Sequence, residues 1–153
     1  MRPTVQGTVR RGGRRRDWIP VLARVPLFAG VSKRHLGRIA RAATTRRFSA
    51  TTRILHVDDP GGKTFYVILD GQVSVLRNGR RIARLGPGEE FGEMALLTDS
   101  PRTATVVADT DVTVMCLSRS AFNKVLKSEP AVSVALLRTL AERLRVSERS
   151  HSH

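Results

Sequence analysis

The sequence places one carboxylate and one guanidinium nine positions apart in the run FGEMALLTDSPRTAT, residues 91–105. Glu93 follows a glycine within an apolar stretch, and Arg102 follows a proline. An arginine offers a planar, permanently charged fork to an anion, and a carboxylate accepts a hydrogen bond from a hydroxyl. The pair therefore suits a small ligand that carries both an anionic group and a hydroxyl. The alternative is a structural ion pair between Glu93 and Arg102.

The residues between and beside the two charges favour an anion site. Gly92 has no side chain, so a ligand can approach the backbone there. Residues 93–97 can form one short helical turn, whose free N–H groups favour a phosphate. Pro101 fixes the backbone on the approach to Arg102. A carboxylate beside a phosphate is unfavourable because both are negatively charged, so Glu93 is expected to bind a different group of the ligand.

Composition excludes several classes of protein. The chain has 153 residues, which suits one domain with one core, and its single cysteine, Cys116, is expected to be a buried apolar residue. No apolar run approaches a membrane span, and no secretory signal is present, so we expect a cytoplasmic protein. The sequence contains no catalytic constellation, no phosphate-binding Gly-x-x-x-x-Gly-Lys loop and no metal-ligand set. We expect a sensor with no catalytic residues, no metal and no cofactor, and not an enzyme.

The positive charge is concentrated in the first third of the chain. Residues 1–53 hold 14 Lys and Arg but one acid, whereas residues 54–153 hold 13 Lys and Arg and 12 acids, and the net charge is +14. Such an asymmetry suggests an acidic partner, which is nucleic acid, an anionic membrane surface or an acidic protein face. The alternative is an arginine-rich genome together with a solvated helical face.

Periodicity divides the chain into a basic tail, helices, strands and helices again. We expect a flexible tail over 1–17 and a domain over 18–149, followed by a tail over 150–153. Within the domain, 18–46 is expected to be helical, 47–118 strand-rich and 119–149 helical. Ser32 is a candidate N-cap, as are Ser118 and Ser120, and Asn78-Gly79 predicts a two-residue hairpin. Short, evenly spaced strands predict an antiparallel sandwich, jelly roll or barrel.

This order of elements, together with four motifs, resembles the cyclic nucleotide-binding domain family. VPLFAGVSKRHLGRIA is similar to its N-terminal helical segment, DPGGKTFYVILDGQVSV to its central hairpin, and RIARLGPGEEFGEMALL to the approach to its phosphate-binding cassette. The run 91–105 resembles that cassette and is called the cassette below. The resemblance covers about residues 25–146. It implies an α+β fold, in which an eight-stranded antiparallel β-roll lies between an N-terminal helical segment and C-terminal helices.

The resemblance also implies the ligand and its contacts. The ligand would be cyclic AMP or cyclic GMP, with its phosphate at Arg102 and its ribose 2′-hydroxyl at Glu93. Thr103 hints at tolerance of cyclic GMP, although threonine also simply suits a strand. The expected ligand-binding residues are Gly92, Glu93, Met94, Ala95, Arg102 and Thr103. Val73 and Leu85 are candidates for the base pocket.

In this family, ligand capture moves the C-terminal helix, which covers the base. Four residues of that helix are candidates for the lid, and the sequence does not choose among Arg138, Leu140, Arg143 and Leu144. The helix would act on a downstream protein, and its apolar stripe is also a candidate homodimer seam. The alternative function is a basic adaptor that binds nucleic acid or anionic membrane through residues 1–53, with the β-roll as scaffold. The chain departs from the family by having Thr51 and Asp58 where glycines are usual at turns.

Overall fold

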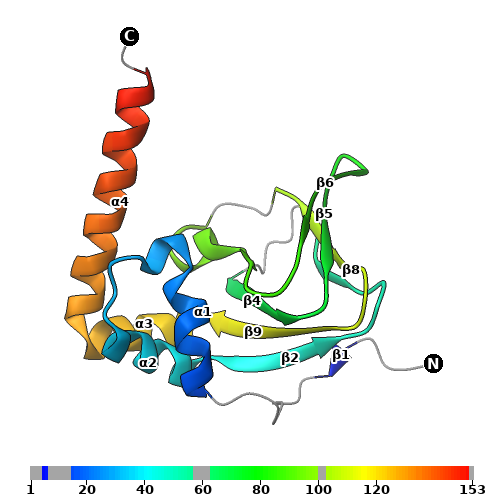
Figure 1. Cartoon of the computed structure of the whole chain (residues 1–153), viewed down its shortest axis with the longest axis horizontal. Helices are drawn as coiled ribbons and strands as arrows, with labels where there is room; N and C mark the ends of the chain where they lie inside the picture. Colours follow the sequence, from blue (N-terminus) through cyan, green and yellow to red (C-terminus); the bar gives the residue numbers. More distant parts are fainter. Residues whose placement is uncertain (1–4, 7–14, 57–62, 100–102, 152–153) are drawn as a thin grey trace.

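The computed structural model describes residues 5–6, 15–56, 63–99 and 103–151, which form two antiparallel sheets with helices against one side (Figure 1). The larger sheet has the order β1-β2-β9-β4-β7, formed by Val5–Gln6, Thr44–Phe48, Val112–Ser118, Thr64–Asp70 and Glu90–Phe91. The smaller sheet has the order β3-β8-β5-β6, formed by Arg53–Leu55, Thr105–Ala108, Val73–Arg77 and Arg80–Leu85. The predicted α+β class and antiparallel β-roll are confirmed, with β2 to β9 as the eight expected strands.

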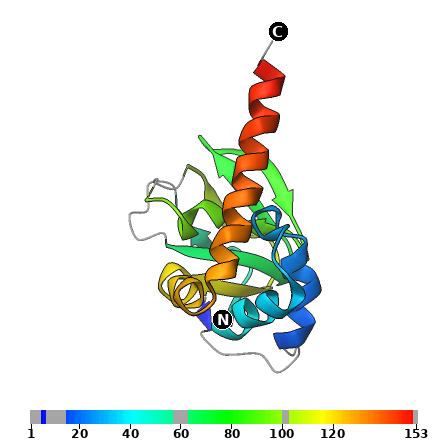
Figure 2. The same ribbon diagram turned by 90° about the vertical axis from the view of Figure 1, so that its left-hand side faces the viewer.

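Helical elements precede the roll, interrupt it once and follow it. The helical elements are η1 (Arg15–Trp18), α1 (Ile19–Ala23), η2 (Pro26–Phe28), α2 (Lys33–Ala42), η3 (Glu93–Leu96), α3 (Arg119–Ser128) and α4 (Pro130–His151). Figure 2 shows α4 crossing one side of the molecule and extending well beyond the β-roll. No helix in the described part of the chain combines the length and apolar character that crossing a bilayer requires.

Strands β4 and β9 are buried on both faces, because the larger sheet lies between the smaller sheet and the helices. Phe65 and Val67 of β4 face the helical side, whereas Tyr66 and Ile68 face the interior of the roll. This alternation follows from the two-residue period of a strand. Cys116 of β9 also faces the roll interior, and burial raises the pKa of its thiol to about 12. The expected buried cysteine is therefore confirmed.

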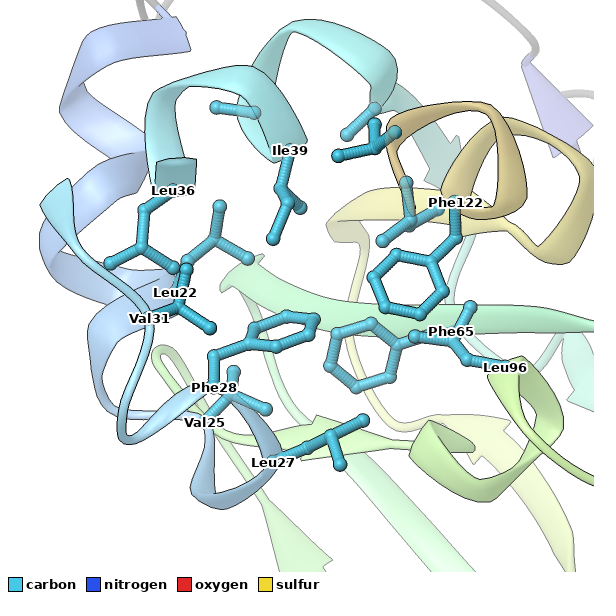
Figure 3. Packing of buried hydrophobic residues seen from close by; sticks show 14 of the residues in the cluster. Leu22, Val25, Leu27, Phe28, Val31, Leu36, Ile39, Phe65, Leu96 and Phe122 are labelled. Atoms are coloured by element: carbon cyan, nitrogen blue, oxygen red, sulfur yellow. The ribbon is translucent and has the colours of Figure 1, made fainter. Parts of the chain in front are cut away.

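The helical core is built around three phenylalanines from three elements (Figure 3). The ring of Phe28 lies 6.0 Å from the ring of Phe65 in an edge-to-face arrangement and 6.0 Å from the ring of Phe122. Leu36 and Ile39 of α2 close the same cluster from above in Figure 3. Edge-to-face aromatic pairs add to the free energy of burial. The core thus joins η2, β4 and α3 into one body.

Local signals in the sequence fix several boundaries. The Ser32 and Ser118 hydroxyls accept hydrogen bonds from the backbone N–H groups of His35 and Ala121, so both act as N-caps. Asn78 and Gly79 have φ values of 53° and 76°, as the predicted hairpin turn requires.

Observed boundaries differ from the expected ones in three places, one of which is the end of α4 at His151, two residues beyond the expected 149. Strand β2 begins at Thr44, three residues before the predicted boundary, because Thr44 and Thr45 pair with Cys116 and Met115 of β9. β-Branched threonines suit such a ladder better than the end of a helix. Within the predicted 1–17 tail, Val5 and Gln6 pair with β2, and η1 begins at Arg15.

Helix α4 leaves four large apolar side chains in solvent, and two of them, Leu137 and Leu144, lie seven positions apart and form an exposed row on one face. The exposed fractions of Val134, Leu137, Leu144 and Val146 are 46%, 67%, 62% and 52%. Leu140 instead packs against the helical core. The exposed row is the part of α4 on which the predicted homodimer seam would lie.

The turn between β2 and β3 supplies a prediction about stability. Thr51 has a φ of 75°, a left-handed conformation that is costly for a β-branched residue, and its side chain is exposed. Asp58, the other residue at an expected glycine position, lies outside the described residues. We expect Thr51→Gly to raise the free energy of unfolding by about 1 kcal/mol, because glycine adopts this φ without strain. Chemical denaturation measures the change.

The matched control is Asn78→Gly, at a position with a φ of 53°. Asparagine already tolerates the left-handed region, so we expect a smaller gain there. A loss of stability in Thr51→Gly would show that the threonine side chain makes a contact that outweighs its backbone strain.

Candidate functional site

The first part of the cassette follows β7 and lies against β4. Phe91 pairs with Tyr66 of β4, and their rings stack at 5.0 Å. Gly92 has a φ of 82°, a conformation that L side chains rarely adopt, and this turns the chain into η3. The expected short helical turn is therefore present over Glu93–Leu96, and the Ala95 N–H donates to the Gly92 carbonyl. Leu96 anchors the turn in the helical core.

Glu93 lies where η3, η2 and α4 meet. Its carboxylate receives a backbone hydrogen bond from Leu27 of η2. Its Oε1 atom lies 3.8 Å from Nη1 of Arg143 on α4, which is an ion pair but too long for a hydrogen bond. Among the described residues, Oε2 of Glu93 and Nη2 of Arg143 are both buried and have no hydrogen-bond partner. Two buried polar atoms from different elements thus lack partners at one place.

Burial raises the pKa of Glu93 above its ordinary value. The charge of Arg143 opposes this shift, the charge of Glu90 adds to it, and the Leu27 hydrogen bond opposes it. Desolvation penalises the ionised carboxylate, and the cation at 3.8 Å does not offset it fully. A half-buried carboxylate that has one unpartnered oxygen and a raised pKa is typical of a functional group.

The structure distinguishes the four lid candidates of α4. Arg143 contacts Glu93, and Leu140 packs into the helical core. Leu144 is 62% exposed, and Arg138 is exposed beside a surface groove. Of the four, Arg143 is therefore the one that the fold brings to an expected ligand-binding residue.

The other expected site residues have different placements. Ala95 is buried, Met94 lies within η3, and Thr103 is exposed just before β8, where its carbonyl accepts a hydrogen bond from Arg77. Arg102 lies outside the described residues. Val73 and Leu85, the two base-pocket candidates, lie directly opposite one another on β5 and β6 and pack in the roll interior.

Two residues that bear on the cassette were not singled out from the sequence. One is Leu27, whose backbone reaches Glu93. The other is Arg119, the first residue of α3, whose side chain bonds to Ala95, Thr98 and Asp99. A cation in the first turn of a helix opposes the helix dipole, and this position was the signal that could have identified Arg119.

Two side chains of α2 hold the junction between α3 and α4. Glu129, the C-cap of α3, lies 3.1 Å from Nε2 of His35 and 3.6 Å from Nε of Arg38. His35 therefore has a structural partner within the fold. Across the described residues, no group of three or more His, Cys, Asp or Glu side chains is arranged to hold a metal ion.

An open groove of about 930 Å³ runs between α4 and residues 26–35. It includes Arg138, Thr139 and Arg143 in its lining but no residue of η3. The groove therefore lies on the helical side of the Glu93–Arg143 contact, away from the roll.

Some cations of the basic first third have partners within the fold. Arg38 pairs with Glu129, and the Arg46 guanidinium lies 5.0 Å from the centre of the Phe48 ring. These two arginines stabilise the domain. Binding of nucleic acid or membrane by residues 1–53 stays a prediction.

Comparison with known proteins points to one family. The model of the cyclic nucleotide-binding domain matches residues 45–129. A cyclic nucleotide-gated potassium channel of Mesorhizobium japonicum is 38% identical over 135 residues, which are 88% of this chain and 37% of the channel. A cAMP-dependent protein kinase regulatory subunit of Hypocrea atroviridis is 34% identical over 113 residues, 74% of this chain and 24% of that protein. The chain thus spans well under half of either relative.

A solved structure supports the same relationship. The N-terminal domain of a transcriptional regulator from Streptomyces coelicolor A3(2) superposes with a TM-score of 0.79 at 33% identity. The match covers 87% of this chain and 98% of that domain.

The raised pKa of Glu93 predicts a pH-dependent cost. When the pKa of a carboxyl is higher in the folded than in the unfolded protein, the protein loses stability as pH rises from the unfolded to the folded pKa. At low pH the carboxyl is protonated in both the folded and the unfolded protein, so the loss is absent. We therefore expect Glu93→Gln to unfold at a higher temperature than the wild type at about pH 7, with the difference shrinking towards about pH 4. Thermal unfolding at several pH values measures it.

Glu142→Gln is the control, because Glu142 is exposed and pairs with Arg145 on the surface of α4. Its unfolding temperature should stay close to that of the wild type. A lower unfolding temperature for Glu93→Gln at pH 7 would contradict the prediction.

Proposed function

Because the chain belongs to the cyclic nucleotide-binding domain family, we propose that it is a non-catalytic sensor of cyclic AMP, cyclic GMP or both, acting in the cytoplasm. The single observation that carries the proposal is the contact between Glu93 and Arg143. Each residue contributes a buried polar atom that has no partner among the described residues. Burying such atoms is costly unless a ligand or water satisfies them.

The unpaired atoms suit a ribose hydroxyl. A hydroxyl has one O–H to donate and two lone pairs to accept with. Its O–H can donate to Oε2 of Glu93 while its oxygen accepts from Nη2 of Arg143, so one hydroxyl can complete both groups. A phosphate oxygen could serve Arg143, but it has no proton to donate to Glu93. The chemistry of the pair thus favours a ribonucleotide.

The resemblance to the family motif supports the remaining proposed contacts, which are those to the phosphate and the base. Arg102 would hold the cyclic phosphate with its guanidinium fork, aided by backbone N–H groups of the first turn of η3. Val73 and Leu85, which lie opposite one another inside the roll, would contact the base. Thr103, on the exposed approach to β8, would contact the base or the phosphate and permit cyclic GMP.

Helix α4 would transmit the effect of ligand binding to a partner. Arg143 lies on α4, so a ligand that completes its hydrogen bonds binds more tightly when α4 lies near the cassette. Such a ligand shifts the population towards that arrangement. The exposed row on α4, which includes Leu137 and Leu144, would then meet a downstream protein or a second copy of the chain.

Titration calorimetry tests the ligand class. We expect the wild type to bind cyclic AMP or cyclic GMP, and Arg102→Ala to bind on the order of 100-fold more weakly, because two charge-assisted hydrogen bonds are lost. Arg145→Ala, which removes an exposed arginine of α4, is the control and should bind like the wild type. Absence of binding by the wild type, or unchanged binding by Arg102→Ala, would rule out the proposal.

The 2′-deoxy form of the nucleotide tests the roles of Glu93 and Arg143. The wild type should prefer the ribonucleotide over 2′-deoxy cyclic AMP by about tenfold or more, because the deoxy form leaves both buried groups unpaired. Glu93→Gln and Arg143→Ala should each reduce that ratio, whereas Arg145→Ala should preserve it. A ratio that is unchanged in Arg143→Ala would remove Arg143 from the site.

A further inference from the structure

We infer that Arg119 is the positioning residue that holds the cassette in shape and ties it to the C-terminal helices, an inference that rests on the function proposed above. Its Nε atom donates to the Ala95 carbonyl at 2.8 Å, and its Nη1 atom lies 2.5 Å from Oδ1 of Asp99. Its Nη2 atom donates to the Thr98 carbonyl. One side chain of α3 therefore bonds to three residues of the cassette.

The geometry needs an arginine. A guanidinium presents its N–H donors in a rigid plane, so it can bond to three acceptors at once, whereas a lysine has a single nitrogen on a flexible stem. The Arg119 side chain is 19% exposed, whereas Asp99 is 80% exposed. The hydrogen bond and charge of Arg119 hold the pKa of the Asp99 carboxyl below its ordinary value. Arg119 is thus the largely buried partner and Asp99 the exposed one.

The placement of Arg119 is unfavourable for α3 itself. It is the first residue of the helix, where the helix dipole repels a cation. Two of the residues that it holds, Thr98 and Asp99, lie outside any helix or strand. A cation at this end of α3 therefore fixes a stretch of cassette backbone that has no helix or strand to hold it.

The same helix links the cassette to α4. Arg119 begins α3, and Glu129, which ends it, is held by His35 and Arg38 immediately before α4 starts. Phe122 and Val125 anchor α3 in the helical core between these two points. A displacement of the cassette would thus reach α4 through a helix that is attached at both ends.

A simpler role is that Arg119 only stabilises the fold. That role predicts a lower unfolding temperature in Arg119 variants, with nucleotide affinity and the response of α4 unchanged. A positioning role predicts that both of these change, even in a variant that stays folded. The two roles therefore differ in measurable quantities other than stability.

The test uses the full chain as wild type, Arg119→Lys and Arg119→Ala, with Lys124→Ala, an exposed lysine of α3, as control. Calorimetry with cyclic AMP and cyclic GMP measures affinity. Hydrogen exchange measures the backbone of residues 92–99 without nucleotide, and that of residues 138–149 with and without saturating nucleotide. We expect both Arg119 variants to bind about tenfold more weakly or worse, to exchange faster over 92–99, and to lose part of the protection that nucleotide confers on α4.

Affinity, exchange and α4 response equal to those of the wild type would overturn the inference, whatever the unfolding temperature. If Arg119→Ala does not fold, Arg119→Lys alone tests the inference, because lysine keeps the positive charge but cannot make the three hydrogen bonds of the guanidinium. If the wild type binds neither nucleotide, the proposed function fails, but the exchange of residues 92–99 still tests the role of Arg119. Faster exchange in the folded Arg119 variants supports the inference that Arg119 holds the cassette, and exchange equal to that of the wild type rejects it.

Discussion

The pairing of β4 with β9 is the contact on which the rest of the structure depends. Both strands are buried on both faces, so each contributes to two cores at once. Phe65 and Val67 on one face of β4 support the helices, and Tyr66 on the other face stacks on Phe91 at the start of the cassette. Removing apolar surface from water on both sides of one ladder stabilises both cores together. The cassette and the helices are thereby fixed to the same two strands.

Within the site, apolar packing fixes the backbone, whereas the polar contact is incomplete. The apolar residue Leu96 and the stacked Phe91 hold the beginning of the cassette firmly. The polar residues Glu93 and Arg143, in contrast, meet at 3.8 Å without a hydrogen bond, each with a buried atom lacking a partner among the described residues. Packing thus sets the position of the backbone, while the polar contact is left incomplete. An incomplete contact between the cassette and α4 costs little to rearrange.

Local features of the fold could be predicted from sequence, and contacts between distant segments could not. Ser32, Ser118 and Asn78-Gly79 act on neighbouring backbone, so their roles follow from residue type and position. Glu93 was identified by its motif. The choice of Arg143 among four candidates depended on the rotation of α4 about its axis, which is set by packing of Leu136 and Leu140. Arg119 was missed because two of its three acceptors are the backbone carbonyls of Ala95 and Thr98, and its place at the start of a helix was the only local signal.

The length of α4 has a mechanical consequence. The helix has 22 residues, and its first part packs on the helical core through Leu136 and Leu140 and meets Glu93 through Arg143. At 1.5 Å per residue it is about 33 Å long, so a rotation of the whole helix by about 10° about Pro130 would move its far end by about 6 Å. Figure 1 shows that this far end lies well away from the roll. A small rearrangement of the packed part would therefore produce a larger displacement where the helix extends beyond the roll.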